Sequence, residues 1–484
     1  MEPRKLARQY IGGKWREGTG KTKLPDVNPY TGTTFAEYQV ASKADTDEAY
    51  ESAQSAKLAW DAVNPYAKRT VFENAVKVIE ENRDEIVGII IEELGGTGLK
   101  AAFEIGLVID IIKEAATFPL RMEGKILPSP IDNRENFLFR EPLGVIGVIS
   151  PFNFPFFLSM KAVATALAAG NGVVLKPHED TVITGGTLLA KIFEEAGLPP
   201  GLLNVILTDI PTIGDYFVEH PVPRAIVFTG SNTVGAHVAE VAGRHLKKVV
   251  LELGGNNAFI VLDDADIDLA VDAAVFSRFT HQGQICMSAN RVLVHDSVLE
   301  EFQNKYVSKV RSLSVGDPAD ASTIVGPLIN KRQAKNLTRV VDNAVESGAT
   351  ALIHGDVDGT LFSPTVVTDV TRDMEIFREE LFGPVSVIMG FSTDQEAVDI
   401  ANDSDYGLSG ALHTRDIERG MRLARQVDTG MIHINDASIH DEPIVAFGGT
   451  KLSGVGRLNG QWSLDEFTTM KWVSVNHGRR IFPY

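Results

Sequence analysis

VIGVISPFNFPFFLSMKAVATALAAGNGVVLKPHE occupies residues 145–179 of this 484-residue chain. The apolar run Val145–Ile149 reads as a buried strand, Ser159–Ala169 as a helix, and Gly172–Leu175 as a second buried strand. Two strands connected through a helix form a right-handed βαβ crossover, which makes the strands parallel. Glycines and prolines interrupt the uncharged part of the stretch, so it does not predict a membrane-spanning helix. The stretch therefore predicts a parallel α/β sheet.

The same alternation of apolar runs and helical patterns continues toward the C-terminus. The further segments of the first series are a helix at Thr181–Ala196 and strands at Leu203–Leu207, Ala225–Phe228 and Val249–Leu251. A second series, which predicts another α/β domain, begins near Ala258. Its expected helices are Ile267–Thr280, Val298–Ser312 and Lys331–Gly348, and its expected strands are Arg291–His295, Val366–Thr368, Val385–Phe391 and Met431–Asn435. The strand-compatible segments Gly124–Pro142 and Phe467–Val475 are expected to form a small peripheral sheet.

The charge and the cysteine content of the chain indicate which binding partners and which cellular compartment to expect. The net charge is −18, which disfavours binding to nucleic acid and to anionic membranes. A single cysteine, Cys286, excludes an intrachain disulfide and a cysteine zinc site, and no metal is expected. This cysteine usage suits a reducing compartment. Residues 1–15 have no apolar core of a signal peptide, so we expect a cytoplasmic protein.

The cysteine lies in the sequence His281-Gln-Gly-Gln-Ile-Cys286. A lone cysteine is most often a small buried hydrophobic residue. Here Gly283 and the glutamines suit an exposed loop better than a core segment. A thiolate in such a loop is a strong nucleophile when it is accessible and its pKa is lowered. The pattern therefore makes Cys286 a candidate nucleophile.

Three further segments carry polar groups at the ends of expected strands. Glu252 closes a strand and precedes Gly254 and Gly255; it is either a solvent-facing carboxylate or a general base. Asn153 is either a turn former or a donor to an oxyanion. The turn Gly230-Ser231 suits a phosphate at a helix start or plain helix capping, and its spacing is not that of the GxGxxG motif.

Taken in order, these and other motifs resemble the aldehyde dehydrogenase superfamily over essentially the whole chain. The motifs are Tyr10–Trp15, Asn28–Gly32, Gly147–Pro155, Lys176–Glu179, Phe228–Gly235, Glu252–Gly255, Gly283–Cys286, Glu379–Val385, Tyr406–Gly410 and Phe447–Gly454, together with Asn402 and Asp403. Two positions depart from the usual pattern, Phe152 before Asn153 and Leu458 after Arg457. Neither removes a group that the chemistry needs.

The resemblance implies a fold and roles for particular residues. The implied fold is a Rossmann-type cofactor domain (residues 1–123 and 143–252), an α/β catalytic domain (253–450) and oligomerisation segments (124–142 and 464–484). Cys286 is implied as the nucleophile, Glu252 as the general base and Asn153 as the oxyanion donor, together with the backbone N–H of Cys286. The implied cofactor-binding residues are Lys176, Glu179, Gly230, Ser231, Gly235, Leu253, Glu380 and Phe382. The carboxylate of Glu179 favours NAD over NADP, with some use of NADP because Lys176 is close by.

The substrate is the last expectation. The candidate pocket residues are Phe154, Phe157, Ile285, Met287 and Phe447, which are apolar and suit a flat ring. Residues 435–443 and 456–460 resemble the benzaldehyde, vanillin and salicylaldehyde dehydrogenases. We therefore expect an enzyme that oxidises an aromatic aldehyde. The resemblance also implies a homodimer or homotetramer. The alternatives are an aliphatic or semialdehyde dehydrogenase of the same mechanism, a CoA-acylating relative, and a non-catalytic protein on this fold.

Overall fold

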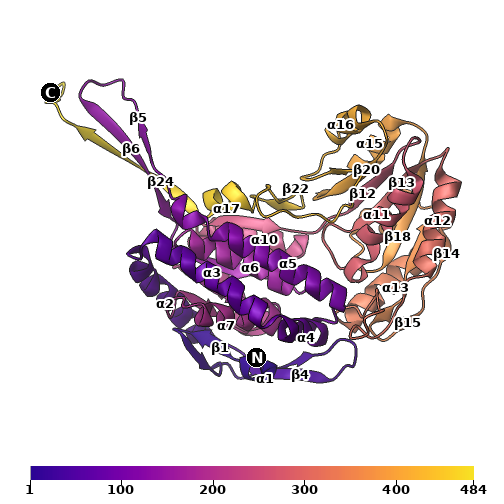
Figure 1. Cartoon of the computed structure of the whole chain (residues 1–484), viewed down its shortest axis with the longest axis horizontal. Coiled ribbons are helices and arrows are strands. Elements are labelled where there is room, and N and C mark those ends of the chain that lie inside the picture. Colours follow the sequence, from indigo (N-terminus) through magenta and orange to yellow (C-terminus); the bar gives the residue numbers. More distant parts are fainter. Residues whose placement is uncertain (1) are drawn as a thin grey trace.

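A computed structural model describes residues 2–484 (Figure 1) and contains two large sheets, one three-stranded sheet and three two-stranded sheets. The first sheet has the strand order β2-β1-β9-β8-β7-β10-β11-β23. These strands span Lys14–Arg16, Gln9–Ile11, Leu203–Val205, Gly172–Lys176, Val145–Ile149, Ala225–Thr229, Lys248–Glu252 and Gly454–Val455. The five strands from β9 to β11 run parallel, and antiparallel strands close both edges. The expected parallel sheet is confirmed, and the stretch at 145–179 forms two adjacent strands at its centre.

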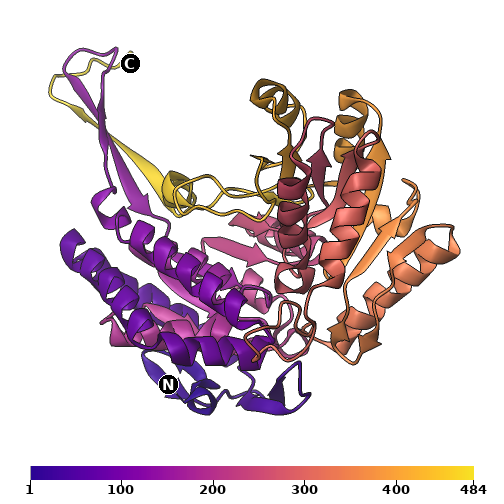
Figure 2. The same cartoon turned by 45° about the vertical axis from the view of Figure 1, so that its right-hand side comes forward.

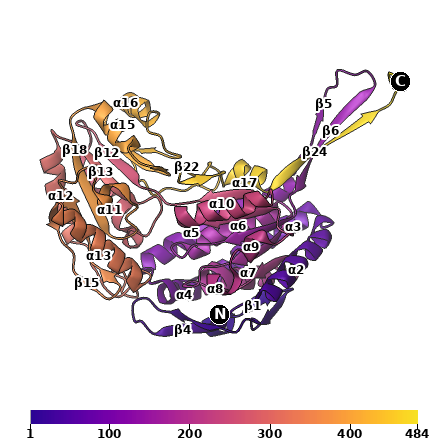
Figure 3. The same ribbon diagram turned by 180° about the vertical axis from the view of Figure 1, so that it is seen from behind.

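Helices cover both faces of the first sheet. Alternate strand residues enter different clusters: Val173 and Leu175 pack with α6 (Pro155–Ala168) and α7 (Leu188–Glu195), whereas Val174 packs with α2 (Lys43–Asp61) and α10 (Asn232–Arg244). This follows from the two-residue period of a strand. Helices α3 (Pro65–Glu81) and α5 (Gly98–Ala115) lie outside α6 and α7 on one face (Figure 1), and α10 and α2 lie on the other (Figure 3).

The second sheet has the order β14-β17-β18-β13-β12-β20-β21 and is parallel except for edge strand β14. Its strands span Thr350–Ile353, Thr365–Thr368, Val385–Phe391, Ala289–His295, Asn257–Val261, Gly410–His413 and His433–Ile434. Helix α11 (Ile267–Phe279) and helix α12 (Leu299–Arg311) pack on one face, and α13 (Lys331–Glu346) packs on the other. Figure 2 shows this part, coloured from rose to orange, beside the indigo and magenta first part.

Several expected elements differ by a few residues at their boundaries, among them the following three. Helix α6 begins at Pro155 rather than at Ser159, because proline is well placed in the first helical turn. The helix expected at Thr181–Ala196 begins with one wide turn at Ile183–Thr187 and becomes regular only at Leu188. The strand expected at Met431–Asn435 is reduced to His433–Ile434.

The third sheet forms an arm that projects from the body and carries the C-terminus near its tip (Figure 1). It has the order β24-β6-β5, with β24 at Thr468–Asn476, β6 at Arg134–Pro142 and β5 at Lys125–Leu127. Nine residue pairs join β24 to β6, from Thr468 opposite Pro142 to Asn476 opposite Arg134. The peripheral sheet expected from two segments distant in the sequence is therefore present.

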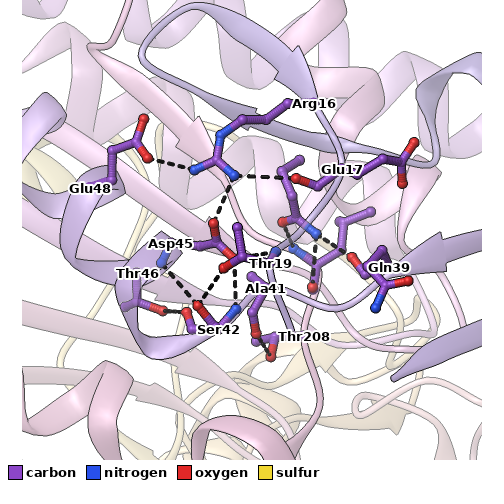
Figure 4. A network of polar contacts seen from close by, with 12 residues as sticks. Arg16, Glu17, Thr19, Gln39, Ala41, Ser42, Asp45, Thr46, Glu48 and Thr208 are labelled. Carbon is purple, nitrogen blue, oxygen red and sulfur yellow. Dashed lines mark hydrogen bonds and ion pairs between the residues drawn. The ribbon is translucent and has the colours of Figure 1, made fainter. Parts of the chain in front are cut away.

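A polar network fixes the N-terminal edge of the first sheet (Figure 4). Arg16 on β2 donates to Asp45 at 2.7 Å and to Glu48 at 2.6 Å, both on α2. Asp45 also accepts from the backbone N–H groups of Thr19 and Ser42, and with Ser42 it forms a capping box at the start of α2.

None of the helices among residues 2–484 is both long and apolar enough to cross a bilayer.

Candidate active site

Asn153, Glu252 and Cys286 approach one another from three different segments. Asn153 follows β7 and Glu252 ends β11, so both lie at the carboxyl ends of parallel strands that flank β10. Crevices at such strand ends are the usual ligand sites of open α/β sheets. Cys286 comes from the segment that enters β13 of the second sheet. The first and second parts of the chain therefore both contribute to this site.

The segment that carries Cys286 is buried, which corrects the exposed loop expected from its glutamines. His281, Gln282 and Gln284 are at most 1% exposed. The Gln282 amide donates to the carbonyl oxygen of Pro327 at 2.8 Å, and the Gln284 side-chain oxygen accepts from the N–H of Ile329 at 3.0 Å. These bonds pair one polar atom of each buried amide with the backbone. The segment is therefore a fixed support for Cys286.

Cys286 itself is partly exposed, and its carbonyl oxygen is held in place. The Asn257 amide donates to that oxygen at 2.8 Å and also to the carbonyl oxygen of Ser288 at 2.8 Å. A Cβ on Gly255 would lie 2.3 Å from the same oxygen, so only glycine permits this close approach. Burial, and then the carboxylates of Glu380 and Glu252, raise the pKa of the thiol well above its usual value. The resting group is therefore a thiol, and forming the thiolate requires transfer of its proton.

Glu252 is 5% exposed, and neither of its carboxyl oxygens has a hydrogen-bond partner within residues 2–484. Burial raises its pKa to about 8, against the opposing charges of Lys161 and Arg457. A carboxyl group with a pKa near neutrality can both accept and release a proton at physiological pH. Buried carboxyl groups without partners are concentrated at functional sites. The alternative of a solvent-facing carboxylate at the strand end is therefore wrong.

Asn153 points one amide hydrogen at the nucleophile segment. Its Nδ2 atom donates to the carbonyl oxygen of Gln284 at 2.9 Å, and the residue is 4% exposed. A side-chain amide nitrogen carries two hydrogens, so one remains for another acceptor. Asn153 and Cys286 line the same cavity.

The turn from Gly230 to Gly235 opens α10 next to the strand that carries Glu252. The Gly230 N–H donates to the carbonyl oxygen of Glu252 at 3.1 Å. The Ser231 side chain makes no capping bond, so its hydroxyl and the first-turn N–H groups are available to an anion. A Cβ on Gly235 would lie 2.4 Å from a methyl group of Leu253, so glycine here lets Leu253 pack against the helix.

Asn232 is a residue of this turn that the sequence reasoning missed. Its Oδ1 atom accepts from the N–H of Gly254 at 2.9 Å, and its Nδ2 atom donates to the carbonyl oxygen of Leu452 at 2.7 Å. It therefore joins the helix start to the glycines after Glu252. The available signal was an asparagine in the first turn, which capping explains equally well.

The remaining candidate cofactor residues come from both parts of the chain. Lys176 ends β8 and is 6% exposed, whereas Glu179 after it is exposed. Burial lowers the pKa of Lys176 and the nearby Glu179 carboxylate opposes that shift. Glu380 accepts from the N–H of Gly255 at 2.9 Å, and burial raises its pKa to about 7. The Phe382 ring meets Phe152 edge to face at 5.7 Å, which places Phe382 against the turn that carries Asn153.

All five candidate pocket residues line one cavity with Asn153 and Cys286. The cavity contains about 420 Å³ of space not filled by atoms, part of it continuous with solvent. Phe154 directly precedes α6 and Phe157 lies in its first turn, Ile285 and Met287 flank Cys286, and Phe447 lies in the segment before β23. Sequence reasoning missed the other lining residues, which are Phe103, Leu107, Leu158, Ile439 and Asp441. Phe103 and Leu107 share one face of α5, because residues four apart in a helix are neighbours.

This site can be compared with those of known proteins. A family model described as "Aldehyde dehydrogenase family" matches residues 15–473. The chain belongs to the aldehyde dehydrogenase family. The expected family and fold class are therefore confirmed.

Three relatives show which members of this family are similar. "Benzaldehyde dehydrogenase YfmT" of Bacillus subtilis (strain 168) is 63% identical over 479 residues, with 99% of each chain covered. The crystal structure of an NAD-dependent benzaldehyde dehydrogenase from Corynebacterium glutamicum superposes with a TM-score of 0.91 at 44% identity, covering 98% of this chain and 97% of that one. The crystal structure of a salicylaldehyde dehydrogenase from Pseudomonas putida G7, complexed with salicylaldehyde, superposes with a TM-score of 0.96 at 34% identity and 99% coverage of both.

Proposed function

We propose that this chain is an NAD-dependent dehydrogenase that oxidises aromatic aldehydes of the benzaldehyde and vanillin type to the carboxylic acid. The single observation that carries the proposal is the wall of the Cys286 cavity, which is apolar and contains four phenylalanine rings: Phe103, Phe154, Phe157 and Phe447. Aromatic rings gain about 0.5–1.5 kcal/mol per well-placed ring pair beyond simple burial. The relatives named for benzaldehyde and salicylaldehyde support the same substrate class.

The residues around the strand ends fit a dinucleotide. The first turn of α10 and the free hydroxyl of Ser231 would hold the pyrophosphate, with Gly230 and Gly235 keeping the turn close to the sheet. Lys176 and Glu179 would hold the adenosine ribose, Glu380 the nicotinamide ribose, and Phe382 would lie near the ring. The bound cofactor supplies the hydride acceptor. We propose the division into a cofactor domain at 1–123 and 143–252 and a catalytic domain at 253–450 on this basis.

The chain's own residues would perform the remaining chemistry in two stages. Cys286, which is partly exposed, releases its thiol proton to solvent water, and its Sγ atom bonds to the aldehyde carbon to give a tetrahedral thiohemiacetal. Asn153 Nδ2 and the backbone N–H of Cys286 donate to its oxyanion. Loss of the hydride leaves a thioester on Cys286. Glu252 then takes a proton from a water molecule, the hydroxide adds to the thioester carbon, and the C–S bond breaks to release the acid and the thiolate.

The assay follows NADH absorbance with benzaldehyde as the substrate. Wild-type protein should reduce NAD, and Cys286→Ala should not, because no other described residue in the cavity can form the thioester. Turnover by Cys286→Ala at the wild-type rate would refute the mechanism. A propanal, betaine aldehyde or succinic semialdehyde kcat/KM about tenfold above that of benzaldehyde, a difference of about 1.4 kcal/mol, would refute the aromatic assignment alone.

Glu252 separates this proposal from a CoA-acylating enzyme. A CoA thiol attacks a thioester without a base that activates water. Glu252 is buried without a hydrogen-bond partner, and it is close enough to Cys286 for its charge to raise the pKa of the thiol. It is therefore suited to activate water for hydrolysis. The free Cys286 thiol also supports the proposal that the protein functions in a reducing compartment such as the cytoplasm.

We propose that the protein is a homo-oligomer assembled through the β5–β6–β24 arm. The arm exposes apolar side chains that a second copy of the same arm would cover. Trp472 on β24 is 67% exposed and Ile126 on β5 is 75% exposed. The edge strand β5 also leaves backbone groups unpaired. A dimer or tetramer formed through this arm would bury these groups.

A further inference from the structure

The cavity beside Cys286 is apolar apart from the Asn153 amide, the Cys286 thiol and one carboxylate. Among the residues that line it, Asp441 is the one with a formal charge. It lies between Ile439, which also lines the cavity, and the exposed Glu442. The aldehyde chemistry assigned to Asn153, Glu252 and Cys286 has no use for this carboxylate.

Two buried donors hold the carboxylate of Asp441 in one orientation. Lys161 Nζ, on α6, lies 2.8 Å from Oδ2, and Asn459 Nδ2 donates to Oδ1 at 2.7 Å. The side chains of Lys161 and Asp441 are 1% and 4% exposed, and Asn459 is fully buried. Lys161 is 280 residues from Asp441 in the sequence, whereas Asn459 is 18 residues from it. A buried pair with such partners keeps its geometry better than an exposed one.

Lys161 also connects this carboxylate to the cavity wall. Its Nζ atom lies 3.6 Å from the centre of the Phe447 ring, and the ring lines the cavity. A cation at this distance is attracted to the face of the ring. The ammonium group is thus placed behind the wall, while the carboxylate is part of the wall itself.

The carboxylate retains capacity to accept another hydrogen bond. An ionised carboxyl group offers about four lone-pair positions on its two oxygens. Lys161 and Asn459 use one on each oxygen. The charge of Lys161 balances that of Asp441, so the pair does not attract a cationic substrate. What it offers to a ligand in the cavity is a fixed acceptor for a neutral donor.

We propose that Asp441, oriented by Lys161 and Asn459, is a specificity-determining residue that accepts a hydrogen bond from a hydroxyl group on the ring of an aromatic aldehyde. This inference rests on the proposed function, since it names the substituent that the same cavity recognises. The ring would lie among the phenylalanines, and the hydroxyl group would meet Asp441. The preferred substrates are therefore hydroxylated benzaldehydes.

The test measures binding without turnover, so that it does not depend on the proposed chemistry. Calorimetry gives Kd values for the 2-, 3- and 4-hydroxybenzaldehydes and the matching fluorobenzaldehydes, using Cys286→Ala protein saturated with NAD. Fluorine is close to hydroxyl in size and donates no hydrogen bond. At one ring position the hydroxyl compound should bind at least about tenfold more tightly, as expected for a bond to a charged acceptor.

The same pair of ligands is then measured with Asp441→Asn added. We expect the hydroxyl-to-fluorine ratio to fall below about threefold, with the Kd of the fluorinated compound nearly unchanged. Glu442→Gln is the matched control, because this neighbouring carboxylate is half-exposed and does not line the cavity; it should leave the ratio intact.

Three results would overturn the proposal. One is that no ring position favours hydroxyl in the Cys286→Ala protein, a measurement that stands even when Asp441→Asn does not fold. Another is that the preference survives Asp441→Asn. The third is an equal loss of binding for both ligands, which would make Asp441 a purely structural residue. Failure of the proposed function would be seen separately, as absence of NAD reduction by wild-type protein with benzaldehyde.

Discussion

Asn153 Nδ2 donates a 2.9 Å hydrogen bond to the carbonyl oxygen of Gln284, two residues before Cys286. This bond joins the turn after β7 in the first sheet to the segment that enters β13 in the second. It orients the amide, so that its remaining hydrogen is held in a fixed direction at the cavity. A donor that is already oriented costs no reorganisation when charge develops on the substrate oxygen.

Asn153→Ala should therefore slow the formation of the thioester. Loss of one oxyanion donor typically costs about a hundredfold to a thousandfold in rate. The measurement is the NADH formed in a single turnover with benzaldehyde. Asn304→Ala is a suitable control, because Asn304 is exposed on α12. A loss of less than about threefold in Asn153→Ala would contradict the assigned role.

Glu252 should give the hydrolysis step a pH dependence. Burial raises its pKa to about 8, so the fraction of ionised base falls about tenfold for each pH unit below that value. Thioester hydrolysis should therefore rise with pH and level off above about 8. Glu252→Gln cannot ionise, so it should lose this rise and release a burst of NADH before slow turnover. Rapid-mixing measurements across this pH range test both points, and an unchanged pH profile in the variant would exclude Glu252 as the base.

The strand pattern predicted much of the fold, because a buried parallel strand has a clear signature. Val145–Ile149 was predicted with its observed bounds, and the polar groups that follow β7 and β11 meet where parallel strands end. The burial of Gln282 and Gln284 was not predictable. Their amides are paired with backbone groups of residues 327 and 329, and composition alone reads such residues as exposed.

The ion pair between Lys161 and Asp441 could not be predicted from the sequence for a related reason. The two residues are 280 positions apart, and only the packing of α6 against the segment before Phe447 brings them together. A single sequence shows the periodicity of its apolar residues and the chemistry of residues that are neighbours along the chain. It does not report which distant charges share a buried site. The same limit applies to Asn232, whose contacts with Gly254 and Leu452 cross between segments.

Cofactor choice should depend on the exposed carboxylate of Glu179. A 2′-phosphate on the adenosine ribose would meet this like charge, whereas the ribose hydroxyls of NAD would donate to it. We expect a higher kcat/KM with NAD than with NADP. Glu179→Gln should narrow the difference, by about tenfold if the repulsion is worth about 1.4 kcal/mol. Initial rates with both cofactors at fixed benzaldehyde test this, and a wild-type preference for NADP would be the opposite of the expected result.

Assembly should depend on the apolar face of the arm. Trp472→Glu together with Ile126→Lys introduces charges where a second copy is expected to pack, so the double variant should be monomeric. Light scattering should give a multiple of 52.6 kDa for wild type and 52.6 kDa for the variant. Ile417→Glu is the control, because Ile417 is 53% exposed on α16 (Ile417–Ala424), which lies across the molecule from the arm (Figure 1). A wild-type mass of one chain at micromolar concentration would refute the assembly.

Asp26 should make the protein less stable as the pH rises. Its side chain on β3 (Lys23–Val27) is fully buried, and burial together with the Glu93 carboxylate raises its pKa well above the usual value. Burial also raises the pKa of Glu93, against the hydrogen bonds that its carboxylate accepts from the N–H groups of Ile183 at 2.7 Å and Thr184 at 2.8 Å. The folded protein therefore holds a proton on Asp26 that the unfolded chain releases above a pH of about 4.

The sign of the effect follows from this difference in proton binding. A group whose pKa is raised by folding contributes most below its unfolded pKa. That contribution falls by about 1.4 kcal/mol per pH unit until the folded pKa is reached. Asp26→Asn removes the titration and keeps a donor for Glu93, so its unfolding temperature should exceed that of wild type by more at about pH 8.5 than at about pH 5.5. Glu37→Gln on the paired strand β4 (Thr34–Gln39) is the control, because Glu37 is half-exposed. A difference in unfolding temperature between Asp26→Asn and wild type that stays constant with pH would mean that Asp26 is ionised in the folded protein.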